Sequence, residues 1–193
     1  MRVLLFEPPK IRWEMMGDVV AMPLGLAQLA GCLEEAKIPV DILDANASKI
    51  DWQKLEPAIA RTHADLIGIT VYTPHVPEVA RAVQIARQAA PEATIVLGGP
   101  HVTFTAEETL TTMPGADMVV RGEGDQIIVD LARALDAGDG LEDVPGISYR
   151  GDGEIVDNAH PPPPGSAPPP PPPPPPRPPP PTSLTAPLPH HPA

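Results

Sequence analysis

The 193-residue sequence predicts a doubly wound α/β domain, a three-layer, Rossmann-like fold in which helices cover both faces of a parallel sheet. Three observations predict this fold. Short apolar runs recur along residues 1–158, segments with a helical spacing of apolar residues separate them, and the runs are uniformly apolar, as strands buried on both faces are. Because strands that alternate with helices pair in parallel through right-handed crossovers, we expect a five-stranded parallel sheet in a flavodoxin-like order.

The apolar runs are the predicted strands, at residues 3–6, 40–43, 66–71, 95–97 and 118–120. Between and after them, most apolar residues recur with the i, i+3, i+4, i+7 spacing of a helix face. These helical sets begin at Leu26, Leu55, Val76, Ala106 and Ile128. Beyond the last set, residues 146–150 and 154–156 flank a Gly-Asp-Gly turn, which predicts a small C-terminal β-hairpin.

Capping residues mark the starts of three of these helices. Asp51 and Asp125 stand where N-cap residues are expected, because a side-chain oxygen there accepts hydrogen bonds from the free N–H groups of the first turn. Thr105 together with Glu108 matches a capping box.

The composition changes abruptly at residue 159. Most of the chain's 31 prolines lie in residues 159–193, including an unbroken run at 168–176. Proline-rich segments of this kind form no packed core and adopt extended polyproline II or disordered conformations. The sequence therefore predicts two parts, an α/β domain at 1–158 and a low-complexity tail at 159–193.

Charge and cysteine content exclude several classes of function. The net charge of −12 and the lack of clustered Lys and Arg argue against a nucleic-acid surface. The single cysteine, Cys32, excludes an intramolecular disulfide and a cysteine-based zinc or iron–sulfur site, and its apolar helix predicts a buried core thiol. We therefore predict no metal ligand from the protein itself, so that any metal arrives within a cofactor.

Targeting signals are equally sparse. The uncharged stretch from Val19 to Leu33 is shorter than the roughly 20 residues that a membrane-spanning helix needs. The apolar run at 3–6 is too short for a secretory signal. These features predict a cytoplasmic protein without a membrane span.

In a doubly wound sheet, ligands bind beyond the carboxyl ends of the strands, so the residues that follow each strand are the candidate site. The connection after the first strand has no G-x-G-x-x-G, which disfavours a dinucleotide, and instead carries Trp13, Met15, Met16 and Met22. This long apolar connection suits a large flat ligand, although the same residues would also simply cover the sheet. The third strand ends without the aspartate of a phosphoacceptor receiver domain, which excludes that class.

The glycine pairs after the fourth and fifth strands point to a ligand that lies against bare backbone. Gly98 and Gly99 also suit any tight turn. Glu123, between two glycines, is either a carboxylate favoured by the helix dipole or an acceptor for ligand amides. His101 is expected to form a hydrogen bond rather than to ligate a metal, and Arg121 pairs either with a carboxylate or with a ligand.

Four blocks of sequence, in order, resemble one family. They are PLGLAQLA at 23–30, DLIGIT at 65–70, LGGPHVTF at 97–104 and VVRGEG at 119–124. They are similar to the cobalamin (vitamin B12)-binding domain that precedes the catalytic barrel in cobalamin-dependent radical S-adenosylmethionine enzymes. The resemblance covers residues 1–158, including GISYR at 146–150 in the predicted hairpin.

The resemblance implies a corrin ring on the carboxyl edge of the sheet, with the nucleotide tail passing into the domain beside the glycine turn. By position, the implied cofactor-binding residues fall into three groups. The first would line the nucleotide tail, the second would approach it, and the third would close the far side of the site. The implied cofactor-binding residues are Thr70, Tyr72 and Thr73, then Gly98, Gly99, Pro100 and His101, then Gly122, Glu123 and Gly124, together with Pro8, Pro9, Met22 and Pro23.

Two departures qualify what the resemblance implies. Other cobalamin domains carry D-x-H-x-x-G after the first strand, whose histidine binds cobalt, whereas residues 7–12 here contain no histidine. We therefore expect a detached nucleotide base and no imidazole from that loop on cobalt. The C-x-x-x-C-x-x-C of the iron–sulfur cluster is also missing, so S-adenosylmethionine and a 4Fe-4S cluster would belong to a downstream domain that the proline-rich residues replace. Either the chain is a natural stand-alone module, or its coding sequence is frame-shifted or truncated near codon 159.

The leading hypothesis is a cobalamin-binding domain that acts as a methyl carrier or positions the cofactor, and that catalyses nothing alone. Its partner would be a radical S-adenosylmethionine domain, in cis in relatives or in trans. The alternative is an interaction module without a cofactor, whose proline-rich arm binds aromatic grooves such as those of SH3-like domains. A flavin or another nucleotide is a weaker third hypothesis, because the phosphate-binding loop is missing.

Overall fold

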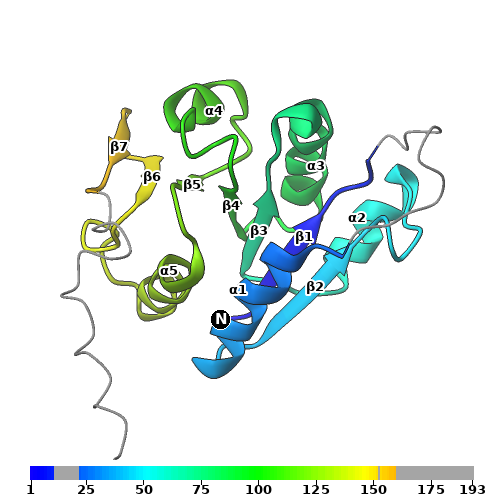
Figure 1. The fold of residues 1–193 in the computed structure, drawn as a ribbon, viewed down its shortest axis with the longest axis horizontal. Coiled ribbons are helices and arrows are strands. Elements are labelled where there is room, and N and C mark those ends of the chain that lie inside the picture. The colour runs from blue at the N-terminus through cyan, green and yellow to red at the C-terminus, as the bar shows by residue number, and fades with distance from the viewer. Residues whose placement is uncertain (11–21, 152, 160–193) are drawn as a thin grey trace, which may run out of the picture. The chain divides into compact units, whose positions relative to one another are not determined.

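The computed structural model in Figure 1 describes residues 1–10, 22–151 and 153–159. The predicted apolar connection at Trp13, Met15 and Met16, and residues 160–193 of the predicted tail, lie outside the described residues. The strands are β1 (Val3–Glu7), β2 (Val40–Asp44), β3 (Leu66–Thr70), β4 (Thr94–Gly98), β5 (Met118–Val120), β6 (Ile147–Arg150) and β7 (Ile155–Asp157). The helices are α1 (Leu24–Glu35), α2 (Trp52–Ala60), α3 (Val76–Ala89), α4 (Ala106–Thr112) and α5 (Asp125–Ala137), with a 3₁₀ turn, η2 (Thr73–His75), before α3.

The predicted α/β fold is confirmed. The strands form a seven-stranded sheet in the order β2-β1-β3-β4-β5-β6-β7, in which β1 to β5 pair in parallel. The C-terminal hairpin does not stand apart from this sheet, because β6 pairs antiparallel with β5 and extends it. The strand order reverses between β1 and β3, which places the ligand crevice of this fold class at their carboxyl ends.

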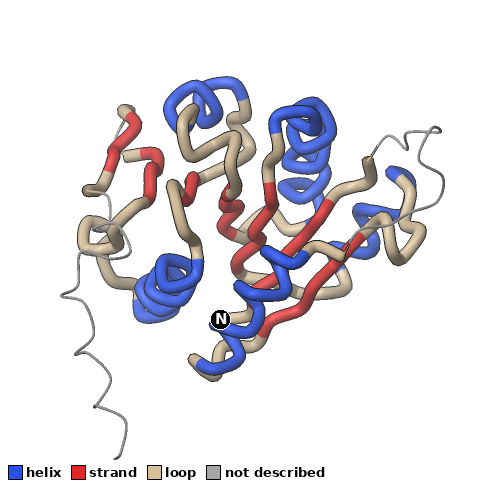
Figure 2. The backbone as a smooth tube through the Cα atoms, in the orientation of Figure 1, coloured by secondary structure: helices blue, strands red, loops and turns tan. Residues whose placement is uncertain are grey.

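Helices cover both faces of the sheet, and Figure 2 shows the two helical layers on either side of the strands. Alternate strand residues point to opposite faces, so each strand contributes to two cores. On one face α1 and α5 pack over side chains such as Leu5 and Val96. On the other face α2, α3 and α4 pack over side chains such as Phe6 and Leu97.

Strand β2 departs from the predicted burial on both faces. It lies at the edge of the sheet and pairs only with β1 among the described strands. Its Ile42 side chain is 44% exposed. A run of apolar residues identifies a strand but does not state its place in the sheet, and an edge strand has a neighbour on one side only.

The predicted helix starts have three different outcomes. Asp51 caps α2 as predicted, because its carboxylate accepts from the N–H groups of Gln53 and Lys54 at 3.1 and 3.0 Å. At α5 the prediction is wrong by one residue, since Gly124 is the N-cap and Asp125 is the first helical residue. At α4 the start is right, since Thr105 is the N-cap, but the capping box is wrong, because the Thr105 hydroxyl donates to the His101 carbonyl at 2.9 Å and caps no N–H group.

The cap at Asp51 predicts a pH-dependent contribution to stability. Desolvation opposes the shift, but the hydrogen bonds and charge of Lys54 and the hydrogen bond of Gln53 lower the pKa of Asp51 overall. A carboxyl whose folded pKa is depressed stabilises the fold above its ordinary pKa, and this contribution is lost as the pH falls through the folded value. Asp51→Ala should therefore lower the thermal midpoint at neutral pH, with the difference shrinking in strong acid, as scanning calorimetry would measure. Asp51→Asn keeps an N-cap acceptor and should lose less; a wild-type-to-Ala difference independent of pH would contradict the assignment.

Two polar side chains attach the hairpin to the rest of the sheet. Buried Arg121 follows β5 and donates to the backbone carbonyls of Ile147, at 3.2 Å, and Asn158. Asn158 donates its amide hydrogens to the carbonyls of Leu141 and Val144 at 2.6 and 2.7 Å. Arg121 therefore contacts backbone carbonyls of the hairpin segment, a role that the sequence did not predict. Within the described ranges, no helix has the length and apolar character needed to cross a membrane.

Candidate functional site

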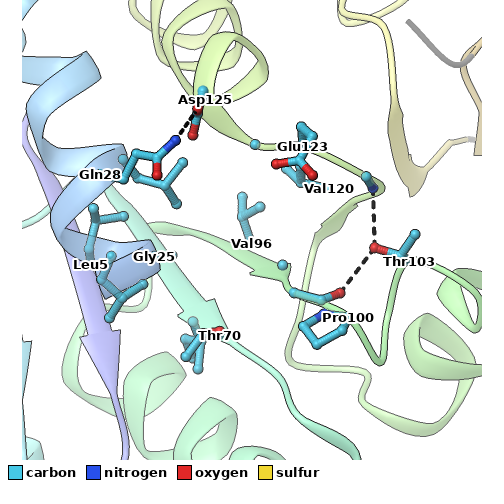
Figure 3. Close-up of a pocket in the computed structure, with 18 of the residues that line it drawn as sticks. Leu5, Gly25, Gln28, Thr70, Val96, Pro100, Thr103, Val120, Glu123 and Asp125 are labelled. Carbon is cyan, nitrogen blue, oxygen red and sulfur yellow. Dashed lines mark hydrogen bonds between the residues drawn. The ribbon is translucent and has the colours of Figure 1, made fainter. Parts of the chain in front are cut away.

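A cavity of about 420 Å³ lies at the carboxyl ends of the central strands, between α1 and α5 (Figure 3). Strands β1, β3 and β4 form its floor, and the loops after β4 and β5 form one wall. The cavity lies beside the reversal in strand order, the position expected for a ligand in this fold.

The floor of the cavity is apolar and is deepened by a glycine within a strand. Leu5, Gly68 and Val96 lie on neighbouring strands and face the same side of the sheet. A Cβ atom on Gly68 would lie 3.0 Å from the Cδ2 atom of Leu5. Glycine weakens a strand interior, so its presence there marks a place where another group approaches the backbone closely.

Two glycine turns form the wall, and each contains a glycine whose positive φ would strain any other residue. Gly99 has a φ of 109°, and a Cβ atom there would lie 2.9 Å from the Val71 carbonyl oxygen. Gly122 has a φ of 81°. A Cβ on Gly98 would meet nothing within 4 Å, so the bare backbone of this residue borders open space.

The structure gathers eight of the predicted cofactor-binding residues around this cavity: Thr70, Tyr72, Gly98, Gly99, Pro100, Gly122, Glu123 and Gly124. The other predicted residues lie elsewhere. Pro8 and Pro9 are buried just after β1, whereas Met22 is 72% exposed and Pro23 is the N-cap of α1. Thr73 and His101 lie outside the cavity wall and contact each other, with 3.2 Å between the Thr73 Oγ1 and His101 Nδ1 atoms.

Further lining residues were not predicted from the sequence. Gly68 carried a signal that was available, namely a glycine in the middle of an apolar strand. Gln28 and Asp125 carried none, because their contact joins two helices that are far apart in the sequence. The Gln28 side-chain amide donates to the Asp125 carboxylate and links α1 to the start of α5 at one end of the cavity, as Figure 3 shows. Other lining residues of this kind are Leu5, Gly25, Leu26, Leu29, Ile69, Val96, Thr103, Phe104 and Val120.

A charged pair lies at the end of β1, next to the cavity wall. The Lys10 ammonium is 2.5 Å from the carboxylate of buried Glu7 and 5.9 Å from the centre of the Tyr72 ring. The Lys10 N–H also donates to the Asn46 side chain at 2.9 Å. Three residues, Glu7, Tyr72 and Asn46, thus hold Lys10 in place. Lys10 lies in the connection after β1, where the sequence lacks a histidine.

The lining favours a largely apolar ligand that carries amide groups. Among the described residues, those that line the cavity include no lysine or arginine, and their polar groups are hydroxyls, backbone amides, Gln28 and two carboxylates. Across the described ranges, no three His, Cys, Asp or Glu side chains gather in a way that could hold a metal ion. Aromatic surface is available at the rim, where Phe104 is 87% and Tyr72 46% exposed.

Cys32 does not line the cavity. It is half-buried on α1 and packs beside the core under that helix, so it is less buried than predicted. Desolvation, with additional contributions from the charges of Asp125 and Glu35, raises the pKa of its thiol. A raised pKa keeps the thiol protonated and unreactive at neutral pH.

The sequence matches the profile of the B12 binding domain family over residues 18–132. It is 34% identical over 156 residues to an uncharacterized methyltransferase of Pyrococcus horikoshii, covering 80% of this chain and 34% of the relative. It is also 34% identical over 164 residues to the anaerobic magnesium-protoporphyrin IX monomethyl ester cyclase of Rubrivivax gelatinosus, covering 81% of this chain and 29% of the cyclase. The chain thus spans about a third of the length of these curated relatives.

A solved structure of the same fold carries the cofactor. The structure of TsrM, a radical S-adenosylmethionine methyltransferase of Kitasatospora setae, with cobalamin and a [4Fe-4S] cluster bound, superposes with a TM-score of 0.71 at 25% identity. The match covers 83% of this chain and 29% of TsrM. OxsB, a cobalamin-dependent S-adenosylmethionine radical enzyme, shares the fold with a TM-score of 0.69 at 19% identity, over 82% of this chain and 22% of OxsB. The chain therefore belongs to the B12-binding domain family and is homologous to the domains of this type in cobalamin-dependent radical S-adenosylmethionine enzymes.

Proposed function

We propose that this chain binds cobalamin with the nucleotide tail in the cavity between α1 and α5 and the corrin ring over the carboxyl ends of the strands. The observation that carries the proposal is the cavity itself. In a chain of the B12-binding family, bare backbone at Gly68, Gly98 and Gly99 opens an apolar space at the ligand-binding edge of the sheet. The same family membership makes cobalamin the first candidate for the ligand.

The residues present fit this cofactor. Cobalamin is large, and its tail ends in a flat aromatic base, which matches a floor of Leu5, Val96 and a strand glycine. Its peripheral amides need hydroxyl and backbone partners rather than salt bridges, and Thr70 and the glycine turns supply such groups. The negative net charge of the chain is therefore compatible with binding.

The nucleotide base would be detached from cobalt, and no histidine of the β1 connection would replace it. Pro8, Pro9 and Lys10 occupy the start of that connection, and residues 11–21 contain no histidine. Lys10 is engaged by Glu7 and Tyr72, and His101 contacts Thr73 outside the cavity wall. The part of the protein is therefore to hold and orient the cofactor and to keep its tail away from water.

Bound cobalamin would supply a cobalt centre able to carry a methyl group. We infer that the chain serves as a methyl carrier or cofactor-positioning module and does not catalyse a reaction alone. The catalytic partner would be a radical S-adenosylmethionine domain, in cis in relatives or in trans, which would hold S-adenosylmethionine and the iron–sulfur cluster. The relatives support this inference, because they include a named methyltransferase and a structure with both cobalamin and a [4Fe-4S] cluster bound.

The proposal is tested by binding of hydroxocobalamin and of cobinamide, which lacks the nucleotide tail. The full chain is incubated with each corrinoid, desalted and examined by absorbance spectroscopy, and the dissociation constants are measured by titration. We expect the chain to retain cobalamin with a shifted spectrum and to bind cobinamide at least tenfold more weakly, because the cavity would then stay empty. A colourless chain after desalting would contradict the proposal and favour an interaction module without a cofactor.

A further inference from the structure

Thr103 joins the two glycine turns of the cavity through one hydroxyl group. Its Oγ1 atom donates to the Gly99 carbonyl at 3.0 Å and accepts the Gly122 N–H at 3.1 Å. Figure 3 shows both hydrogen bonds along one side of the cavity, with Thr103 between the turns after β4 and β5. A hydroxyl is both donor and acceptor, so a single small side chain satisfies both groups.

The two turns have little other backbone connection to each other. Strands β4 and β5 pair through only two residue pairs, Val96 with Met118 and Leu97 with Val119. After these two pairs, the backbone that follows β5 bonds to the hairpin segment instead of β4, because the Arg121 N–H donates to the Gly146 carbonyl at 2.8 Å. The link through Thr103 therefore lies just where the pairing of the two strands has ended.

The positions of the Gly99 carbonyl and the Gly122 N–H determine how far apart the two turns lie at the cavity wall. Gly99 and Gly122 have positive φ angles and no side chains, so little in their own conformational preferences fixes the turns. The Gly99 carbonyl also accepts the Thr103 N–H at 3.3 Å, which holds the first turn closed on itself. The hydroxyl adds the second turn to this arrangement and fixes the separation between the two.

We propose that Thr103 is a positioning residue for the cofactor, which sets the separation of the glycine turns at Gly98–Gly99 and Gly122–Gly124 so that the nucleotide tail of cobalamin fits between them. This inference rests on the proposed function, because it assigns Thr103 a role in the same site. Thr103 need not touch the reacting part of the cofactor. Its effect would be on the part of the ligand that enters the cavity.

The test compares Thr103→Val with Thr103→Ser in the full chain. Valine has nearly the shape of threonine but removes both hydrogen bonds, whereas serine keeps the hydroxyl. We expect Thr103→Val to bind cobalamin about tenfold more weakly and Thr103→Ser to remain within about threefold of wild type. Binding of cobinamide should be nearly unchanged in both. The matched control is Thr111→Val, because Thr111 is an exposed threonine on α4 whose hydroxyl donates only to its own helix, to the Glu107 carbonyl at 2.8 Å.

The binding results distinguish failure of the proposed function from failure of the role assigned to Thr103. A wild-type chain that binds no cobalamin overturns the proposed function and this inference with it. A wild-type chain that binds, with Thr103→Val binding equally well, overturns the role of Thr103 alone. Equal losses for cobalamin and cobinamide, or a serine variant as weak as the valine variant, would show general damage and also overturn it.

A measurement on the unmodified chain keeps the proposal testable if Thr103→Val does not fold. Gly122 is exposed, so its N–H should exchange rapidly with solvent unless the hydroxyl of Thr103 holds it. Hydrogen exchange followed by NMR should show a protected Gly122 amide, with protection that increases when cobalamin is added. Unprotected exchange at Gly122 in both states would overturn the proposal.

Discussion

Gly99→Ala should both destabilise the chain and abolish most of its cobalamin binding. An L-residue at a φ of 109° is strained, and the new Cβ would lie 2.9 Å from the Val71 carbonyl oxygen, so the turn must move. Strained backbone of this kind costs about 1–3 kcal/mol, which denaturant unfolding would detect. Because Gly99 lines the cavity, movement of the turn should also raise the dissociation constant for cobalamin at least tenfold.

Two control substitutions separate the effect of backbone strain from the effect of losing the binding site. Gly138→Ala also places alanine at a positive φ, 71°, but this glycine ends α5 away from the cavity and its Cβ would meet no atom within 4 Å. It should cost about 1–2 kcal/mol of stability and leave binding unchanged. Gly98→Ala should have little effect on stability, since its Cβ borders open space. If Gly138→Ala weakened cobalamin binding as much as Gly99→Ala, the effect would come from stability rather than from the turn.

Gly68→Val should have the opposite profile, with strong loss of binding and little loss of stability. Valine favours a strand over glycine by up to about 1 kcal/mol, and the atom that its Cβ would approach is the end of the flexible Leu5 side chain. The valine methyl groups would occupy the floor of the cavity where we place the nucleotide base. We expect at least a tenfold rise in the dissociation constant for cobalamin, an intermediate rise for Gly68→Ala, and an unfolding free energy within about 1 kcal/mol of wild type.

The matched control for Gly68 is another glycine inside a regular element. Gly31 lies within α1, lines no part of the cavity, and has open space where a Cβ would be. Gly31→Ala should raise stability by about 0.5–1 kcal/mol without changing binding. Unchanged cobalamin binding in Gly68→Val would contradict the placement of the tail in this cavity.

Most of the fold could be predicted because local patterns and the rules of parallel pairing are both strong in this chain. Apolar runs located the strands, and the alternation with helices then required a parallel sheet with helices on both faces. The expectation of strands buried on both faces failed at Ile42 in β2, because a uniformly apolar run does not reveal exposure, although the flavodoxin-like order places this strand at the edge. The capping box at Thr105 did not form, and the bond that its hydroxyl makes to the His101 carbonyl depends on the loop before α4, which the sequence pattern does not describe.

The candidate site could be predicted where it depends on backbone and not where it depends on contacts between elements. Glycines after two strands indicated the wall of the cavity, and the topology brought Gly98 and Gly122 to one place. The contact of Gln28 with Asp125 and the double contact of Thr103 arise only when separate elements pack. Single-sequence patterns do not contain this information.

The most direct test of the central claim is the electron paramagnetic resonance spectrum of cobalamin bound to the full chain and reduced to the Co(II) state. If the tail enters the cavity and no histidine binds cobalt, the spectrum should show no splitting from an axial nitrogen. Splitting by a nitrogen nucleus would mean that the nucleotide base or an imidazole remains on cobalt, and would contradict the account.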